Sequence, residues 1–166
     1  MLTTEYNLPI YKEIIDLEKL SYKEGSGINV EDLLGIWRFQ YVWKKGQSVI
    51  DNVSSSILQV ISASLELSNL TTKEDDPSLE ISNSVRIGIL TIIFSGKAFL
   101  KGNRPLLPFY FKNLVIKIGN ISILKKSFED LELKKMPFFS LIAIGENKKW
   151  MCARGKGGGL AIWIKK

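Results

Sequence analysis

Residues 33–46, LLGIWRFQYVWKKG, indicate the fold class of this 166-residue chain. Between Trp37 and Trp43, large apolar and polar side chains alternate, and only Val42 breaks the polar side. Side chains on a strand point to opposite faces in turn, so this pattern predicts a half-buried β-strand with one aromatic face. We expect that face to line a core or a pocket, and it consists of Trp37, Phe39, Tyr41 and Trp43.

Similar β-rich segments follow along most of the chain, separated by turn residues. Gly119-Asn120 is a two-residue hairpin signal, and Gly88 and Gly96 are expected at bends or bulges. The apolar face of residues 55–67 comprises Ile57, Ile61, Ala63, Leu65 and Leu67, and that of residues 109–118 comprises Tyr110, Leu114, Ile116 and Ile118. The expected strands are residues 37–43, 55–67, 79–83, 85–100, 109–118, 121–126, 138–144, 149–154 and 160–165.

Helix is predicted only near the start of the chain. In residues 8–20, an apolar stripe at helical spacing consists of Ile10, Ile14, Leu17 and Leu20, with Glu13, Asp16, Glu18 and Lys19 outside. Asn29 is expected to cap a short second helix over residues 30–34. We therefore expect one domain, in which residues 1–32 form a helical segment that packs on a β-barrel of residues 33–166.

About eight or nine short strands without a βαβ rhythm predict an all-β protein. Because the connections are short, we favour an antiparallel up-and-down β-barrel of about eight strands. An interior of that size is just wide enough for one small ligand.

Composition excludes several classes of site. The chain has no histidine, which removes His-based triads and the common zinc and haem ligand sets, so we expect no metal and no cofactor. The net charge of +6 suits either a solvated surface or an anionic membrane, and no nucleic-acid-binding motif accompanies it. No signal peptide or membrane-spanning run is visible, so we expect a soluble or peripheral protein that is not secreted.

No catalytic constellation is visible, and we expect a protein that is not an enzyme. Residues 153–160, ARGKGGGL, lack the spacing of a phosphate loop and are expected to form a hairpin between the last two strands. The single cysteine, Cys152, is expected to be a small buried apolar residue. The carboxylate pairs Asp75/Asp76 and Glu129/Asp130 are expected in solvated turns.

Two motifs carry a resemblance to a known family. Residues 34–41, LGIWRFQY, are similar to the G-x-W-R-L-x-Y opening of the plastid lipid-associated protein/fibrillin family of plastids and cyanobacteria. Residues 150–163, WMCARGKGGGLAIW, resemble the R-G-x-x-G turn and apolar strand that close that family's domain. No transit peptide is visible, so the resemblance favours a cyanobacterial-type member.

The resemblance implies a lipocalin-like barrel that binds a small lipophilic molecule, such as a carotenoid, quinone, chlorophyll-type pigment or lipid. The pair Gly35-x-Trp37 is also similar to the lipocalin signature, which implies a structural role at the closed barrel end, with Arg154 over the Trp37 ring. The ligand-binding residues would then be Phe39, Tyr41, Trp43, Trp150 and Arg154. The expected location is the cytoplasm or the surface of the thylakoid membrane.

Alternatives remain at this point. A tetrapyrrole-handling lyase would need inward-facing titratable groups, for which Lys112 and Glu66 are the candidates. A structural or assembly partner of photosynthetic complexes would need an exposed apolar patch, for which Leu106, Leu107 and Phe109 are the candidates. The cations expected to contact anionic lipid are Lys44, Lys45, Arg154, Lys156, Lys165 and Lys166.

Overall fold

A computed structural model describes residues 7–54, 63–69, 78–103, 105–145 and 147–166. In this described part, nine strands form one antiparallel sheet. The strands are β1 (Gly35–Trp43), β2 (Ser64–Asn69), β3 (Ser78–Ile87), β4 (Leu90–Phe99), β5 (Leu106–Ile118), β6 (Ile121–Ser127), β7 (Phe138–Ile144), β8 (Trp150–Gly155) and β9 (Leu160–Lys165). The helices that lie wholly within the described residues are α1 (Tyr11–Glu24) and α2 (Val30–Leu33), with a short 3₁₀ turn, η1 (Leu133–Lys135).

The sheet closes on itself. Its strand order is β4-β3-β2-β1-β9-β8-β7-β5-β6, and a further pairing of β4 with β5 completes an eight-stranded barrel. The first and last barrel strands meet along β1–β9, where Trp43 is opposite Leu160. The all-β antiparallel barrel and its N-terminal helix are thus confirmed, and the architecture is consistent with a lipocalin-like fold.

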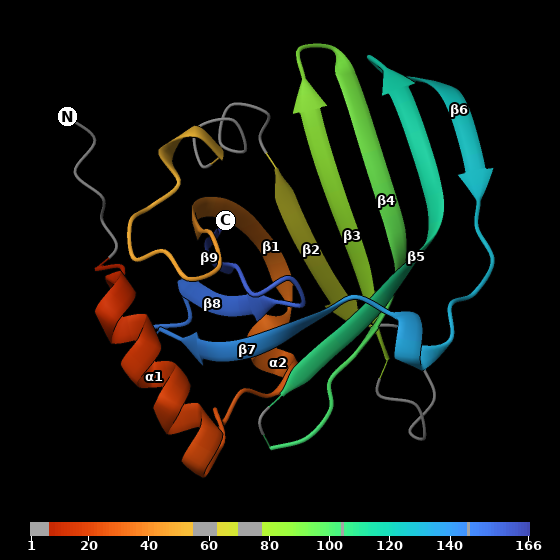
Figure 1. Ribbon diagram of the computed structural model, residues 1–166. Helices are drawn as coiled ribbons and strands as arrows, with labels where there is room; N and C mark the ends of the chain where they lie inside the picture. Colours follow the sequence, from red (N-terminus) through yellow and green to blue (C-terminus); the bar gives the residue numbers. More distant parts are fainter. Residues whose placement is uncertain (1–6, 55–62, 70–77, 104, 146) are drawn as a thin grey trace.

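The ninth strand, β6, lies outside the barrel circuit. The long strand β5 pairs with β7 through its first residues, from Leu106 to Pro108, and with β6 through its last, from Asn113 to Ile118. Strands β3 to β6 therefore project beyond the rest of the barrel (Figure 1). The Gly119-Asn120 hairpin is confirmed, whereas Gly88, expected at a bend or bulge within a strand, lies in the turn between β3 and β4.

Helix α1 lies against the outside of the barrel (Figure 1). It begins after Ile10, whose N–H donates to the Glu13 carboxylate at 2.9 Å. Ile14 is fully buried as expected, but Ile10 and Leu20 are exposed, while Glu18 is buried. The predicted stripe was therefore wrong at both ends. The short second helix and its start at Asn29 are confirmed.

A β-bulge in β1 divides the aromatic row. Phe39 is opposite Trp163, yet Tyr41 is opposite Ile162, so Gln40 is an extra residue and the faces exchange there. Trp37 and Phe39 join the core inside the barrel, whereas Trp43 and Tyr41 pack in a second cluster under α1. The expectation that all four aromatics share one face was wrong.

A second bulge, in β5, changes which side chains of that strand share a face. Ser95 is opposite Asn113 and Gly96 is opposite Phe111, which leaves Lys112 as the extra residue. Phe109 and Phe111 consequently face the core, and Lys112 lies exposed with an ion pair to Asp130. The predicted bulge at Gly96 is confirmed, but the expected alignment of Tyr110 with Leu114 was wrong.

Among the remaining strand predictions, the division into strands 79–83 and 85–100 was wrong, because β3 continues through Ser84 to Ile87 and the chain turns at Gly88 before β4. Residues 138–144 and 160–165 form strands with the expected bounds. In β2, Leu65 and Leu67 are buried as predicted. The predictions for Ile57, Ile61, Asp75 and Asp76 concern positions outside the described residues.

Gly96 is a close contact point between β4 and β5, and this generates a stability prediction. A Cβ at Gly96 would lie 1.9 Å from the Tyr110 carbonyl oxygen, so Gly96→Ala requires the two strands to move apart. We expect a loss of about 2 kcal/mol or more in the free energy of unfolding, measured by urea denaturation. Gly157→Ala is the control, because nothing lies within 4 Å of its Cβ position and it should be nearly neutral. Equal stability of both variants would contradict this account.

Candidate functional site

The barrel interior holds a cavity of about 190 Å³. Its lining is mostly apolar and comes from strands on both sides of the barrel and from the residue just before β2. The polar side chains of Ser64 and Asn83 are the exceptions, and among the described residues of the lining none is titratable. The lining residues are Phe39, Ala63, Ser64, Leu65, Ile81, Asn83, Phe109, Phe111, Phe139 and Trp163.

Aromatic rings form a continuous band along one side of this cavity. Trp163 contacts Phe39 and Phe139 edge-on, with ring centroids 6.1 Å and 5.6 Å apart. Phe139 stacks on Phe109 at 5.1 Å, and Phe109 contacts Phe111 at 5.5 Å. Such ring pairs add to the stability of their burial and hold the cavity wall in one arrangement.

The predicted ligand-binding residues separate into different places. Phe39 lines the cavity. Tyr41 and Trp43 instead line an open groove of about 710 Å³ on the outside of the barrel, beside the start of α1. This separation follows from the bulge at Gln40, since Tyr41 and Trp43 point outward beyond it. That outer groove is a second candidate site, with Leu8, Val49 and Ile50 in its walls.

Trp150 and Arg154 also lie on the outer face of β8. Trp150 packs in the cluster under α1 and not in the interior core. Arg154 Nε and Nη2 donate to the two Glu18 carboxylate oxygens at 2.7 Å and 2.6 Å. Its Nη1 donates to the Gly158 carbonyl oxygen at 2.6 Å. The hydrogen bond to Glu18 raises the pKa of Arg154 above its ordinary value.

The arrangement that the resemblance implies at Gly35 and Trp37 is present with a different cation. Trp37 is fully buried and its Nε1 donates to the Leu33 carbonyl oxygen at 2.7 Å. The cation over its ring is Lys165, at 5.0 Å from the ring centroid, and not Arg154 as expected. The Lys165 side chain passes so close to Gly35 that a Cβ there would lie 2.8 Å from it.

The residues proposed for the alternative functions lie elsewhere than expected. Lys112 and Glu66 are both exposed, so neither is an inward-facing titratable group. Leu107 and Phe109 are buried in the core, and only Leu106 is exposed. The apolar patch predicted there was therefore wrong.

Sequence reasoning missed most of the cavity wall. Trp163 and Phe139 belong to strands that were predicted, but no signal within either strand tells which aromatic ring meets Phe39. Phe109 and Phe111 alternate in the sequence, and that spacing could have indicated an inward pair. The bulge that brings them inward depends on the partner strand β4.

Comparisons with known proteins leave the family open. The chain matches no protein-family model, and no curated protein is significantly similar to it in sequence. None of the helices that the structure describes has the length and apolarity needed to cross a membrane. Within the same described residues, no group of three or more Cys, Asp or Glu side chains is arranged to hold a metal ion.

The Glu18–Arg154 ion pair gives a prediction about how α1 is held. Glu18→Ala leaves a largely buried guanidinium without its carboxylate, since the two side chains are 10% and 26% exposed. We expect a loss of about 3 kcal/mol, measured by urea unfolding. In Asp16→Ala, which breaks an exposed pair with Lys19, the loss should stay below about 1 kcal/mol. Similar losses in both variants would show that the pair does not anchor the helix.

Cys152 yields a prediction about reactivity. It is 1% exposed, and burial raises the pKa of its thiol to about 12. Because only the thiolate is nucleophilic, iodoacetamide at neutral pH should leave the folded protein unmodified and label it fully in urea. Mass spectrometry measures the adduct, and rapid labelling of the folded protein would contradict the buried position.

Proposed function

We propose that this protein binds a small lipophilic molecule inside its barrel and catalyses no reaction on it. The observation that carries the proposal is a cavity walled by a band of aromatic rings, with two polar side chains, Ser64 and Asn83, in an apolar lining. Apolar concave sites with few polar groups are typical of ligand pockets. Burial of the ligand's apolar surface supplies the free energy, at about 25 cal/mol per Å².

The size of the cavity supports one class of lipophilic ligand. Pockets that enclose a whole drug-sized molecule have volumes of about 300–1,000 Å³. A cavity of about 190 Å³ fits a narrow acyl or isoprenoid chain and is too small for a tetrapyrrole ring. We therefore propose a chain-bearing ligand, such as a quinone, carotenoid, lipid or the tail of a chlorophyll-type pigment, with its bulkier part outside the cavity.

The wider setting is also a proposal. The resemblance of residues 34–41 and 150–163 to the plastid lipid-associated protein/fibrillin family, together with the barrel, supports a cyanobacterial-type member at the thylakoid surface. The tetrapyrrole-lyase alternative has less support, because no titratable side chain is present among the described cavity-lining residues. The assembly-partner alternative no longer has its apolar patch at Leu107 and Phe109.

The direct test is ligand capture. The purified protein is incubated with an extract of thylakoid lipids and pigments, repurified, and examined by absorbance and mass spectrometry. A stoichiometric quinone, pigment or lipid would support the proposal. A protein that emerges with no bound molecule would contradict it.

A pair of variants locates the ligand. Ala63 lines the barrel cavity, so Ala63→Leu should fill it and weaken binding of a fluorescent polyene fatty acid at least tenfold. Val49 is 71% exposed in the outer groove, and Val49→Arg should leave that affinity unchanged. Fluorescence titration measures both. The reverse result would assign the ligand to the outer groove beside Tyr41 and Trp43.

A further inference from the structure

Strands β3 to β6 form an arm beyond the barrel, comprising residues 83–94 and 113–127 (Figure 1). The strand register gives this arm one apolar face, because residues opposite each other in neighbouring strands share a face. Two rows of four aliphatic side chains cross it: Ile87, Leu90, Ile118 and Ile121, and then Val85, Ile92, Ile116 and Leu124. In the next row, Asn83 belongs to the cavity lining. The apolar face of the arm therefore continues from the wall of the cavity.

The tip of the arm is unusually apolar for a pair of hairpin turns. The two turns lie side by side, since the Gly119 N–H donates to the Ile89 carbonyl oxygen at 2.8 Å. Ile89 is 70% exposed and Ile121 is 71% exposed, and Ile87 and Ile118 are exposed beside them. Turns normally carry Gly, Asn, Asp, Pro or Ser. A contiguous exposed apolar patch of this kind marks an interaction site.

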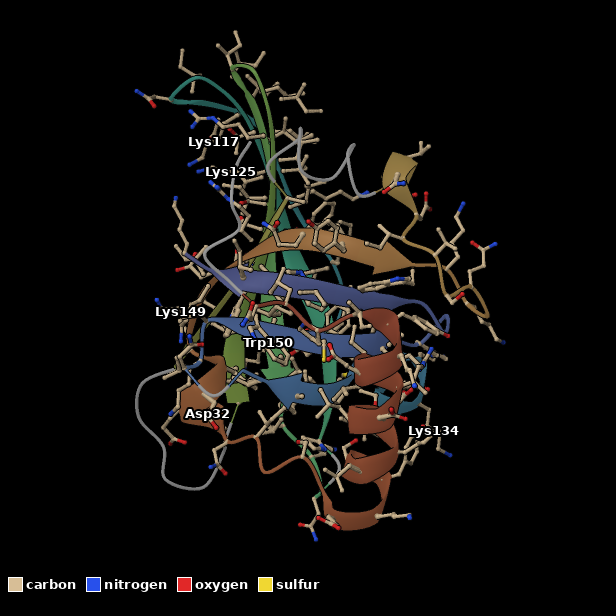
Figure 2. The ribbon with its side chains drawn as sticks, turned by 90° about the vertical axis from the view of Figure 1, so that its left-hand side faces the viewer. Asp32, Lys117, Lys125, Lys134, Lys149 and Trp150 are labelled. Atoms are coloured by element: carbon tan, nitrogen blue, oxygen red, sulfur yellow. The ribbon has the colours of Figure 1, made fainter. Side chains whose placement is uncertain are left out.

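The charged side chains of the same region are all positive. Residues 81–128 contain eight Lys or Arg and no Asp or Glu. On the face of the arm opposite the aliphatic rows, Arg86 and Lys117 share one row and Lys125 lies in the next. Figure 2 shows Lys117 and Lys125 near each other toward the tip. None of these three cations has an ion-pair partner within the described ranges.

We propose that the arm docks tip first on an anionic lipid bilayer. Exposed aliphatic side chains enter the boundary between head groups and acyl chains, and adjacent cations attract anionic head groups. Nucleic acid fits less well, because single-strand binding uses aromatic stacking and the tip carries isoleucines. This inference rests on the proposed function: a protein that carries a lipophilic ligand needs a surface that contacts the membrane, and the arm is that surface. Docking would also place the apolar face of the arm between the bilayer and the cavity.

Vesicle sedimentation tests this docking. The full chain is mixed with vesicles of phosphatidylcholine alone or with added phosphatidylglycerol. We expect binding to the anionic vesicles only, weakened by salt. Lys117→Gln with Lys125→Gln should lower the partition coefficient roughly thirty-fold, since each cation near an anionic membrane contributes about 1 kcal/mol. Ile89→Ser with Ile121→Ser should lower it at least tenfold.

Matched controls carry the same changes away from the arm. Lys23→Gln with Lys134→Gln, and Val53→Ser with Leu133→Ser, alter exposed side chains on α1, η1 and the segment after β1, and should change binding less than twofold. Equal effects of the arm and control pairs would overturn the inference. So would equal binding to both vesicle types, or a wild type that forms a dimer and ignores vesicles. Polyene fatty acid titration without vesicles reports separately on the proposed function, and the arm variants should bind that probe normally.

Discussion

The bulge at Gln40 is the local feature on which the two sides of this barrel depend. One extra residue in β1 turns Trp37 and Phe39 toward the interior and Tyr41 and Trp43 toward α1. A single strand thus supplies aromatic rings to two cores. Without that exchange of faces, α1 would lack the Trp43 ring against which Tyr11 packs, with ring centroids 6.3 Å apart.

The helix, the last hairpin and the barrel are tied together by one arginine. Arg154 binds both oxygens of Glu18 and the Gly158 carbonyl oxygen, so it joins α1 to the turn between β8 and β9. A partly buried charge pair is favourable only when its hydrogen-bonding groups are satisfied, and Nε, Nη1 and Nη2 of this guanidinium each donate a hydrogen bond. The residue that the family resemblance assigns to a ligand pairs with Glu18 on the outer face of the barrel.

The small cavity and the apolar arm are suited to contact different parts of one long ligand. A site of about 190 Å³ accommodates part of a long apolar molecule, and the aliphatic rows of the arm extend the same surface outward. A barrel with a long projecting arm exposes more apolar area than folding alone requires. Function is the physical reason to retain such a surface, because it costs solubility and invites edge pairing along β6.

The sequence by itself determined the all-β class, the hairpin at Gly119, the irregularity at Gly96 and the buried Cys152, because these follow from local alternation and turn chemistry. It did not determine the face of each residue beyond a bulge. The one local sign in β1 was Val42 on the expected polar side, and it packs against the interior core. Only the tertiary structure decided the partners of Trp163, Glu18 and Lys165, because strand closure and helix docking bring together residues that no local pattern relates.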